Sequence, residues 1–429
     1  MASTLHRACA RLRSDQTGIG LIEVVVSALL VVLVSSGVYV GLDASSRTSG
    51  INKQRSLASG IAQQDQDRMR AMAVNELSNY RATTTTTIGA VTYSVASAAS
   101  WVTDATGTAS CTSANAKANY LRISSAVTWP NMRIAPVAIE SVVAPPAGSF
   151  GTNQGSLAVQ VRDRNGAGVA GVAVSLTGAR NYTDTTNALG CVLWGYLPVG
   201  NYTVALAKGG YVDPQGVATP SRQAGVVGEA TSTVAFDYDA GGRIEARYET
   251  WDGSAAVPAN GSVFTAVNSH LTVPLAPFGD GAPHATYTSG LVFPFGDPYG
   301  VYAGSCAGAD PQLYGQPIAL AQVQPGVTAS IAVREPPVNL RVMRGATPVQ
   351  GAVVTLTGTG AGCAALPVRT TGADGYLTDR AFPYGPYDVC VQETVAGTPY
   401  KRTGSVANTA ANGVSATFDM ASAPAGTCP

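Results

Sequence analysis

A stretch of 19 consecutive residues without a charged side chain, Val24–Leu42, constrains this chain more than any other feature. As an α-helix it would extend about 28 Å, which is enough to cross the hydrocarbon core of a bilayer. Residues 1–18 contain three arginines and a single acid, Asp15. Because positively charged flanks stay in the cytoplasm, we expect the N-terminus inside and the rest of the chain outside. The sequence therefore predicts a single-pass protein of the cytoplasmic membrane with an exported body.

The residues that lead into this stretch follow the order Thr17-Gly18-Ile19-Gly20-Leu21-Ile22-Glu23. A Gly, an apolar residue, any residue, Leu-Ile and then Glu resembles the cleavage and methylation motif of type IV prepilins. The resemblance implies that prepilin peptidase removes a leader, residues 1–18, by cutting between Gly18 and Ile19, and that Ile19 becomes an N-methylated amino terminus. It also implies that Glu23 pairs with the terminal amine of a neighbouring subunit when pilin subunits assemble.

Glu23 also has a physical requirement of its own. On membrane-insertion scales a carboxylate at the bilayer centre costs about 2.5–3.5 kcal/mol, so this residue needs an interface or a partner. An ordinary single-span protein would meet the requirement by placing the side chain at the cytoplasmic interface. Glu23 is therefore the candidate assembly residue, and a simple juxtamembrane position is its alternative.

The polar region after the span predicts a continued helix and then a small sheet. Apolar residues recur at ragged helical spacing up to about Tyr80, which predicts an N-terminal helix over 19–80 with its membrane span at about 19–42. The next domain is expected over 81–147, and a helix that leads into a small antiparallel sheet is what the pilin resemblance implies. Runs of β-branched residues predict its strands at 83–88, 90–95 and 120–129.

The C-terminal part of the sequence contains an internal repeat. Gly171–Gly178 matches Gly351–Gly358, and a Thr-Thr-x-x-x-Gly turn and a Gly-x-Tyr segment follow in both copies. Alternating apolar positions between Gly and Asn turns predict antiparallel β-sandwiches over 150–239 and 336–429. The pattern resembles the carboxypeptidase regulatory-like, or prealbumin-like, family, whose modules are structural or adhesive and lack catalytic residues. We interpret the tyrosine of Gly-x-Tyr as a core or corner residue.

A middle β domain is expected over 240–335. Phe293–Val301 is faintly similar to Phe382–Val389, but we expect a different β-sandwich here. The content of 12% charged residues, 48 Gly and 25 Pro suits short strands and turns in an exported β protein. The predicted fold class is therefore α+β: a long N-terminal transmembrane helix with a small pilin-type antiparallel sheet, followed by mostly all-β sandwich modules.

Six of the seven cysteines lie in the exported part, where an oxidising compartment favours disulfides. Cys363 and Cys390 have no counterpart in the first repeat, so we predict that they pair with each other. The remaining cysteines are left unassigned, with free buried thiols as one alternative; they are Cys111, Cys191, Cys306 and Cys428.

The sequence offers little for catalysis. The two histidines of the exported part, His270 and His284, are 14 residues apart among turn residues, and no Walker loop or Gly-x-Ser-x-Gly elbow occurs. We therefore predict no catalytic, cofactor-binding or metal-binding residues and no enzyme. The formal net charge of zero argues against nucleic-acid binding over the whole surface.

Together these features predict a minor type IV pilin or pilin-like subunit, processed by prepilin peptidase. With other pilin subunits and the inner-membrane assembly machinery, it would enter a filament on the cell surface. The large β body favours a low-copy position and would bind a surface glycan or protein, or act as a spacer. Two alternatives remain open: a non-polymerising single-span surface adhesin or receptor, and a pseudopilin of a secretion system.

Overall fold

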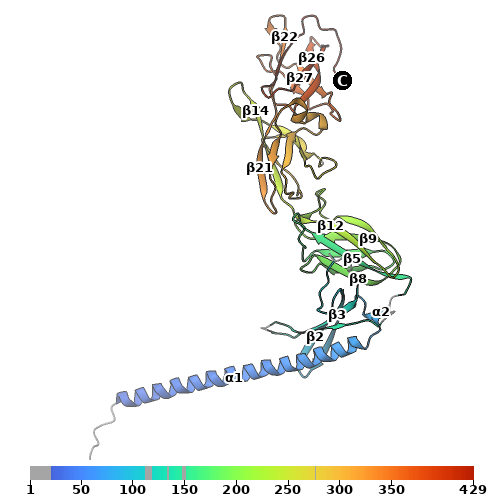
Figure 1. Ribbon diagram of the computed structural model, residues 1–429. Helices are drawn as coiled ribbons and strands as arrows, with labels where there is room; N and C mark the ends of the chain where they lie inside the picture. The colour runs from blue at the N-terminus through green and yellow to red at the C-terminus, as the bar shows by residue number, and fades with distance from the viewer. Residues whose placement is uncertain (1–20, 112–117, 133–134, 147–150, 276) are drawn as a thin grey trace, which may run out of the picture. The chain divides into compact units, whose positions relative to one another are not determined.

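The computed structural model describes residues 21–111, 118–132, 135–146, 151–275 and 277–429. Within them a single long helix precedes a series of β-sheets (Figure 1), which confirms the predicted α+β class and its order of elements. The chain divides into two compact units. One comprises residues 1–99 with 122–143, and the other comprises residues 100–121 with 144–429.

The first unit contains the helices and one four-stranded sheet. Helix α1 (Leu21–Arg70) is continuous for 50 residues, and the short helix α2 (Val74–Leu77) follows it. The prediction of one helix up to residue 80 is therefore too long, because Ala73 has an extended backbone that separates the two helices. The sheet has the order β1-β2-β3-β4, with strands β1 (Arg81–Ile88), β2 (Val91–Val102), β3 (Tyr120–Thr128) and β4 (Val137–Val143).

The second half of α1 packs on this sheet. Ala58 and Ala62 are fully buried, in one cluster with Tyr93 of β2 and with Trp129. Their small side chains leave room for the large rings of the sheet. Gly60 lies between them and faces open space, and α1 continues through it without a break. The sequence pattern after the membrane span is thus a helix face that covers a sheet.

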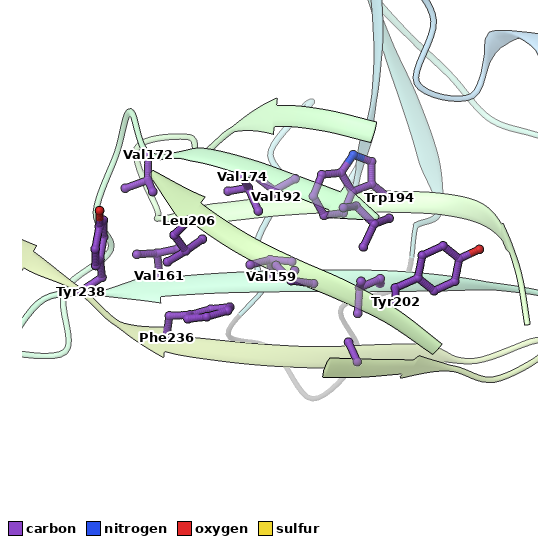
Figure 2. Packing of buried hydrophobic residues seen from close by; sticks show 14 of the residues in the cluster. Val159, Val161, Val172, Val174, Val192, Trp194, Tyr202, Leu206, Phe236 and Tyr238 are labelled. Carbon is purple, nitrogen blue, oxygen red and sulfur yellow. The ribbon is translucent and has the colours of Figure 1, made fainter. Parts of the chain in front are cut away.

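The second unit contains three β-sandwich modules, each with a hydrophobic cluster of its own. In the first module, one sheet has the order β11-β9-β6-β7 and the other β12-β5-β8. Figure 2 shows its core, in which Val159, Val161 and Trp194 of one sheet point into the same interior as Tyr202 of the other sheet. Its strands are β5 (Gln154–Arg162), β6 (Ala173–Thr177), β7 (Tyr182–Thr185), β8 (Cys191–Pro198), β9 (Gly200–Ala207), β10 (Tyr211–Val212), β11 (Ser221–Val226), β12 (Thr231–Asp237) and β13 (Asp239–Ala240).

The middle module has the sheets β15-β14-β18, with β21 also beside β14, and β17-β16-β19-β20. Its strands are β14 (Arg243–Trp251), β15 (Ala256–Pro258), β16 (Gly261–Val267), β17 (Phe278–His284), β18 (Thr286–Thr288), β19 (Tyr299–Ala303), β20 (Ala319–Ala321) and β21 (Thr328–Arg334). Two short 3₁₀ turns, η1 (Ala307–Ala309) and η2 (Pro311–Tyr314), precede β20.

The third module has the sheets β23-β22-β28 and β25-β24-β26-β27. Its strands are β22 (Val338–Arg344), β23 (Thr347–Pro348), β24 (Val353–Gly358), β25 (Arg369–Thr370), β26 (Gly385–Val395), β27 (Thr398–Asn408) and β28 (Val414–Asp419).

The three modules share one topology. In each, the first strand pairs in parallel with the last: β5 with β12, β14 with β21, and β22 with β28. The opposite sheets correspond as well, since β9-β6-β7, β19-β16-β17 and β26-β24-β25 have equivalent orders. The middle module is therefore a third copy of the same sandwich, and the expectation of a different sandwich is wrong. Its β16 reads Gly-Ser-Val-Phe-Thr-Ala-Val, which keeps the strand but not the residues of the repeated motif.

The repeated Thr-Thr-x-x-x-Gly motif has a structural role. Thr186 accepts a hydrogen bond from the backbone N–H of Val172 and donates its hydroxyl to the carbonyl of Val169. Thr371 makes the same two bonds to the backbone of the third module. The second threonine of the motif, named here the threonine clasp, thus links neighbouring backbone segments through the two hydrogen bonds of its buried hydroxyl.

The tyrosine of Gly-x-Tyr is a corner residue, as its pattern predicts. The Tyr202 hydroxyl donates to the carbonyl of Pro198 at 3.0 Å, and the Tyr387 hydroxyl donates to the carbonyl of Pro383 at 2.7 Å. Tyr299 of the middle module donates to a carbonyl six residues earlier at 2.7 Å. All three rings are buried, so each hydroxyl meets its hydrogen-bonding need inside the module.

Candidate functional site

The N-terminal half of α1 is apolar on every side and is not covered by the rest of the described chain. Its large apolar side chains from Ile22 to Leu42 are 50% to 76% exposed. A helix that is apolar all round is stable only inside a protein or a bilayer. By length and composition, α1 can cross a membrane.

Glu23 lies in the first turn of α1 and is exposed. A carboxylate at this end of a helix interacts favourably with the helix dipole. Gly18 and Ile19, the predicted cleavage site, lie outside the described residues. The acid of the predicted motif is therefore placed at the start of the bare apolar segment, whereas the cleavage site stays a prediction.

The other half of α1 is tied to its sheet by a buried carboxylate. Asp65 is 7% exposed and accepts hydrogen bonds from the hydroxyls of Ser97 at 2.7 Å and Ser125 at 2.6 Å, and from Arg68 Nη2 at 2.7 Å. Burial acts to raise the pKa of Asp65, but the hydrogen bonds from Ser125, Arg68 and Ser97 outweigh burial and lower it. The ionised side chain thus joins the helix to β2 and β3.

Gln66 adds a second buried polar link. Its Nε2 donates to the carbonyls of Ile123 and Ile139 at 3.3 and 3.0 Å, and its Oε1 accepts from the Ser141 hydroxyl at 2.6 Å. Neither Asp65 nor Gln66 is recognisable from the sequence, because a polar residue on a helix gives the same pattern whether it faces solvent or a sheet. Together they fix how the helix sits on its own sheet.

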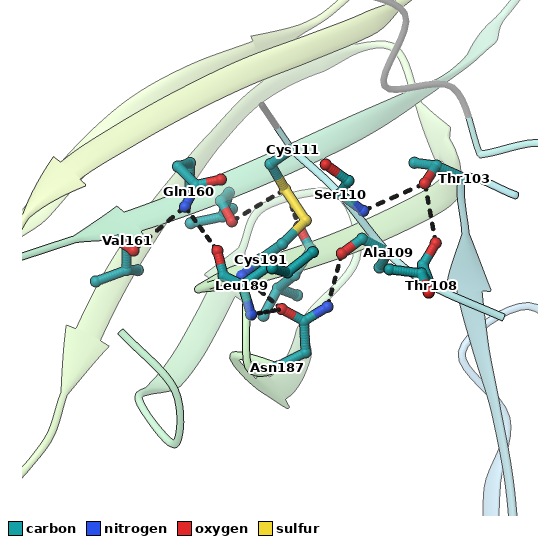
Figure 3. The surroundings of a disulfide bond; sticks show 12 residues. Thr103, Thr108, Ala109, Ser110, Cys111, Gln160, Val161, Asn187, Leu189 and Cys191 are labelled. Carbon is teal, nitrogen blue, oxygen red and sulfur yellow. Dashed lines mark hydrogen bonds between the residues drawn. A yellow bond between two sulfur atoms is a disulfide. The ribbon is translucent and has the colours of Figure 1, made fainter. Parts of the chain in front are cut away.

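In the second unit, a disulfide joins Cys111 to Cys191 at the start of β8 (Figure 3). Asn187 holds the same segment, since its Nδ2 donates to the carbonyl of Ala109 at 2.7 Å. The disulfide therefore secures a segment from before the first module to the sheet of that module.

Trp101 belongs to the same covering segment. Its ring stacks on Tyr196 with 5.5 Å between ring centroids. A Cβ atom on Gly195 would come within 2.6 Å of the Trp101 ring, so glycine alone fits here. Leu193 of the same strand is only 3% exposed although it points away from the module's own core. The segment around Trp101 and Cys111 thus covers the outer side of β8.

The other two disulfides contradict the predicted pairing of Cys363 with Cys390. Cys363 pairs with Cys306 of the middle module, and Cys390 pairs with Cys428. Cys390 lies opposite Thr355, three positions inward from the end of β24, whereas Cys363 lies in the loop beyond that end. Three strand positions span about 10 Å, which is too far for a disulfide. The shared absence of both cysteines from the first copy was therefore a misleading signal.

A buried acid lies where the middle and third modules meet. Glu335 is 3% exposed, and its Oε2 has no hydrogen-bond partner among the described residues. Burial and then the carboxylate of Asp379 raise the pKa of Glu335 to about 8, against an opposing effect of Arg369. Burial and the nearby Glu335 also raise the pKa of Tyr248 in the middle module and of Tyr387 in the third. The carboxyl is therefore held largely protonated at neutral pH.

The described residues offer no metal site. Across the described ranges, no group of three or more His, Cys, Asp or Glu side chains is placed to hold a metal ion. The two histidines form separate exposed pairs, His270 with Asp297 at 3.1 Å and His284 with Asp280 at 2.9 Å. Both are surface residues of the middle module.

Comparisons with known proteins add little. No family model and no curated protein sequence matches the chain. A solved structure of the Bacillus anthracis TIE protein matches 70% of this chain and 59% of its own length, less than two thirds, at 14% identity and a TM-score of 0.21. The minor pilin GBS52 of Streptococcus agalactiae matches 42% of this chain and 95% of its own length, at 14% identity and a TM-score of 0.22. At such TM-scores these matches carry no argument about fold or function.

Proposed function

We propose that this chain is a type IV pilin-like subunit that is processed at its N-terminus and assembled into a surface filament. The observation that carries the proposal is the division of α1 into two halves. The first half is apolar on all sides and bare, and the second half is fixed on a sheet by Asp65 and Gln66. A helix of this kind needs an apolar environment for one end and presents a folded domain at the other.

The bare half would first lie in the cytoplasmic membrane and then pack among the helices of other pilin subunits. Both environments are apolar, so the same side chains suit both. Glu23 then needs a partner, and the methylated amine that prepilin peptidase would create at Ile19 of a neighbouring subunit supplies the opposite charge.

The second unit would be the exported body. Its three sandwich modules are large relative to the helix that would anchor them, which favours a low-copy, minor position in the filament. Disulfides suit an oxidising exterior. In this proposal the body has a structural or adhesive role and no catalytic one.

The mass of the mature N-terminus tests the processing step. We expect the chain recovered from cells to begin at Ile19 and to carry one added methyl group. A chain that retains residue 1, or that is cut elsewhere, would contradict the proposal and favour a non-polymerising single-span adhesin.

A Glu23→Ala variant tests assembly. We expect normal membrane insertion and at least a tenfold loss of incorporation into filaments, measured by shearing filaments from cells and blotting for this chain. Glu76→Ala removes an exposed acid from α2 and should leave incorporation unchanged. Equal incorporation of the Glu23 variant and the wild type would rule out the proposed role. Processing without recovery in sheared filaments would instead favour a pseudopilin.

A further inference from the structure

The outer face of the first module's β5–β8 sheet is covered, and the equivalent face of the third module is open. The term outer face here means the side of the sheet that contains a module's first and last strands, turned away from its core. In the first module, the residue pair Gln160 and Cys191 lies on this face. In the third module, Arg341 and Tyr376 occupy the same two positions and pair with each other as an isolated β-bridge. Residues Cys191 and Tyr376 each follow the glycine of the Thr-Thr-x-x-x-Gly motif, which confirms the correspondence.

Gly195, which lies beneath Trp101, is the fifth residue after the motif glycine of the first module. The fifth residue after the motif glycine of the third module is Arg380. The positions of Gln160, Cys191 and Gly195 are thus held by Arg341, Tyr376 and Arg380 in the third module. The cysteine and the glycine that hold the covering segment in the first copy are therefore absent there. These three side chains line a shallow groove together with short polar residues of the parallel pair β22 and β28: Asn339, Ser415 and Thr417.

The two arginines of this groove are positioned beside one ring. The Arg341 guanidinium lies 5.1 Å, and the Arg380 guanidinium 4.6 Å, from the centroid of Tyr376. Such cation–π contacts orient a guanidinium without neutralising it. Arg341 donates its Nε to the backbone carbonyl of Asp374 at 3.1 Å, and its two terminal nitrogens donate to no acceptor among the described residues. The Asp374 carboxylate lies 3.7 Å from Arg380 and is itself exposed.

The outer face of the middle module differs in charge. Its first strand alternates exposed or half-buried Arg243, Glu245, Arg247 and Glu249 with core residues. Acids and bases are therefore mixed there, whereas the lining of the third module's groove contains two arginines and no acid. Among the three copies, the third alone combines an open outer face with an excess of positive charge in the described residues, because Asp374 pairs with Arg380 and Arg341 has no acid paired with it.

We propose that this groove, named here the Arg341 groove, binds a carboxylate-bearing saccharide. A guanidinium matches a carboxylate with two parallel hydrogen bonds. The row formed by Asn339, Ser415 and Thr417 adds amide and hydroxyl groups that suit sugar hydroxyls. The inference deepens the proposed adhesive role and rests on export of the body.

The groove suits a sugar better than an acidic peptide. Peptide recognition draws on apolar side-chain pockets or on an added strand. The lining of the Arg341 groove consists instead of short polar residues, two cations, the Tyr376 ring that they flank, and a single alanine, Ala416, which packs against the core. The acidic peptide is therefore an outcome that the experiment must distinguish.

Binding of the full chain in neutral detergent to oligogalacturonate tests the proposal, with fully methyl-esterified oligogalacturonate as the uncharged probe. We expect measurable binding to the acid at low salt and at least tenfold weaker binding to the ester. Sialyllactose and lactose form a second pair of probes that separates a sialic acid from a uronic acid. Arg341→Gln and Arg380→Gln should each weaken binding of the preferred acid about five- to tenfold, since each loses a charge-assisted bond.

Arg247→Gln is the matched control, because it removes the same charge from the outer face of the middle module. It should leave binding within twofold of the wild type. Equal binding of acid and ester, no binding of any acidic sugar, or an equal effect of Arg247→Gln would overturn the proposal. Tighter binding of poly-L-glutamate with the same dependence on Arg341 would assign the groove to an acidic protein instead. None of these outcomes affects N-terminal processing or the Glu23 variant, so failure of this inference is distinguishable from failure of the proposed function.

Discussion

The first and third modules have the same interior and different exteriors. Both close a sandwich with a parallel pair of first and last strands, and both use a threonine clasp and a tyrosine corner. They differ on the outer face, where Trp101 and Cys111 cover one sheet and Arg341 and its neighbours leave the other open. A repeated fold thus constrains the side chains that face the core, whereas the side chains that face outward are free to differ and to take on a separate role.

The largest expected effect comes from removing the cover of the first module. Trp101→Ala should destabilise the first module by about 3–5 kcal/mol, because a fully buried tryptophan leaves a cavity over Gly195 and Tyr196. Arg380→Ala changes the position of the third module that corresponds to Gly195, where no covering segment lies, and should cost less than about 1 kcal/mol. Hydrogen exchange of β8 peptides and of residues 376–383 measures each module separately. Similar losses of protection at the two sites would contradict the contrast between a covered and an open face.

The disulfide between Cys390 and Cys428 stabilises the third module and has no counterpart in the first, because the first copy has Ala205 in place of Cys390. Replacing both cysteines by serine should lower the stability of the third module by about 2–4 kcal/mol, because the unfolded chain regains the freedom of a 38-residue loop. The first module should be unaffected. Hydrogen exchange of peptides from each module, measured for the wild type and the variant at increasing denaturant concentration, checks this. A matching loss of protection in the first module would show that the two modules are not independent.

The modules also differ in one buried acid, Glu335. Glu335 lies three residues before Val338, the first core residue of β22, and Gln154 lies three residues before Leu157, the first core residue of β5. The unfolded chain releases the Glu335 proton near pH 4.5, whereas the folded chain holds it up to about pH 8. Its contribution to stability is therefore complete below pH 4.5 and is lost as the pH rises toward 8.

Glu335→Gln keeps a neutral side chain at every pH and should stabilise the third module by on the order of 3 kcal/mol at pH 7. The decrease in melting temperature between pH 5 and pH 8 should become smaller in this variant. Glu229→Gln, at an exposed position of the first module, should leave the pH profile as it is. An unchanged profile for Glu335→Gln would show that the carboxyl is ionised in the folded protein.

The features that were predictable from the sequence are those with a local cause. The uncharged stretch up to Leu42 predicted a long helix, and the Gly-x-Tyr segments predicted a buried corner tyrosine. Each of these features depends only on neighbours along the chain. The middle copy was missed because β16 keeps the alternation of a strand without the residues of the motif. The pairing of Cys363 was wrong because it depends on which loops of different modules meet. The Arg341 groove depends on strand register, which brings residues 339–341, 376–380 and 415–417 together.

The smallest expected effect tests how far the shared interior extends. Tyr202→Phe and Tyr387→Phe each remove one hydroxyl that donates to a proline carbonyl four residues earlier. Each variant should cost about 1 kcal/mol, because one buried hydrogen bond is lost and the ring remains in place. If the modules are true structural copies, the two losses should agree within about 0.5 kcal/mol and should add in the double variant, since the sites share no partner. Local hydrogen exchange at β9 and β26 measures both, and a loss confined to one module would mean that the common corner stabilises only one of the two sandwiches.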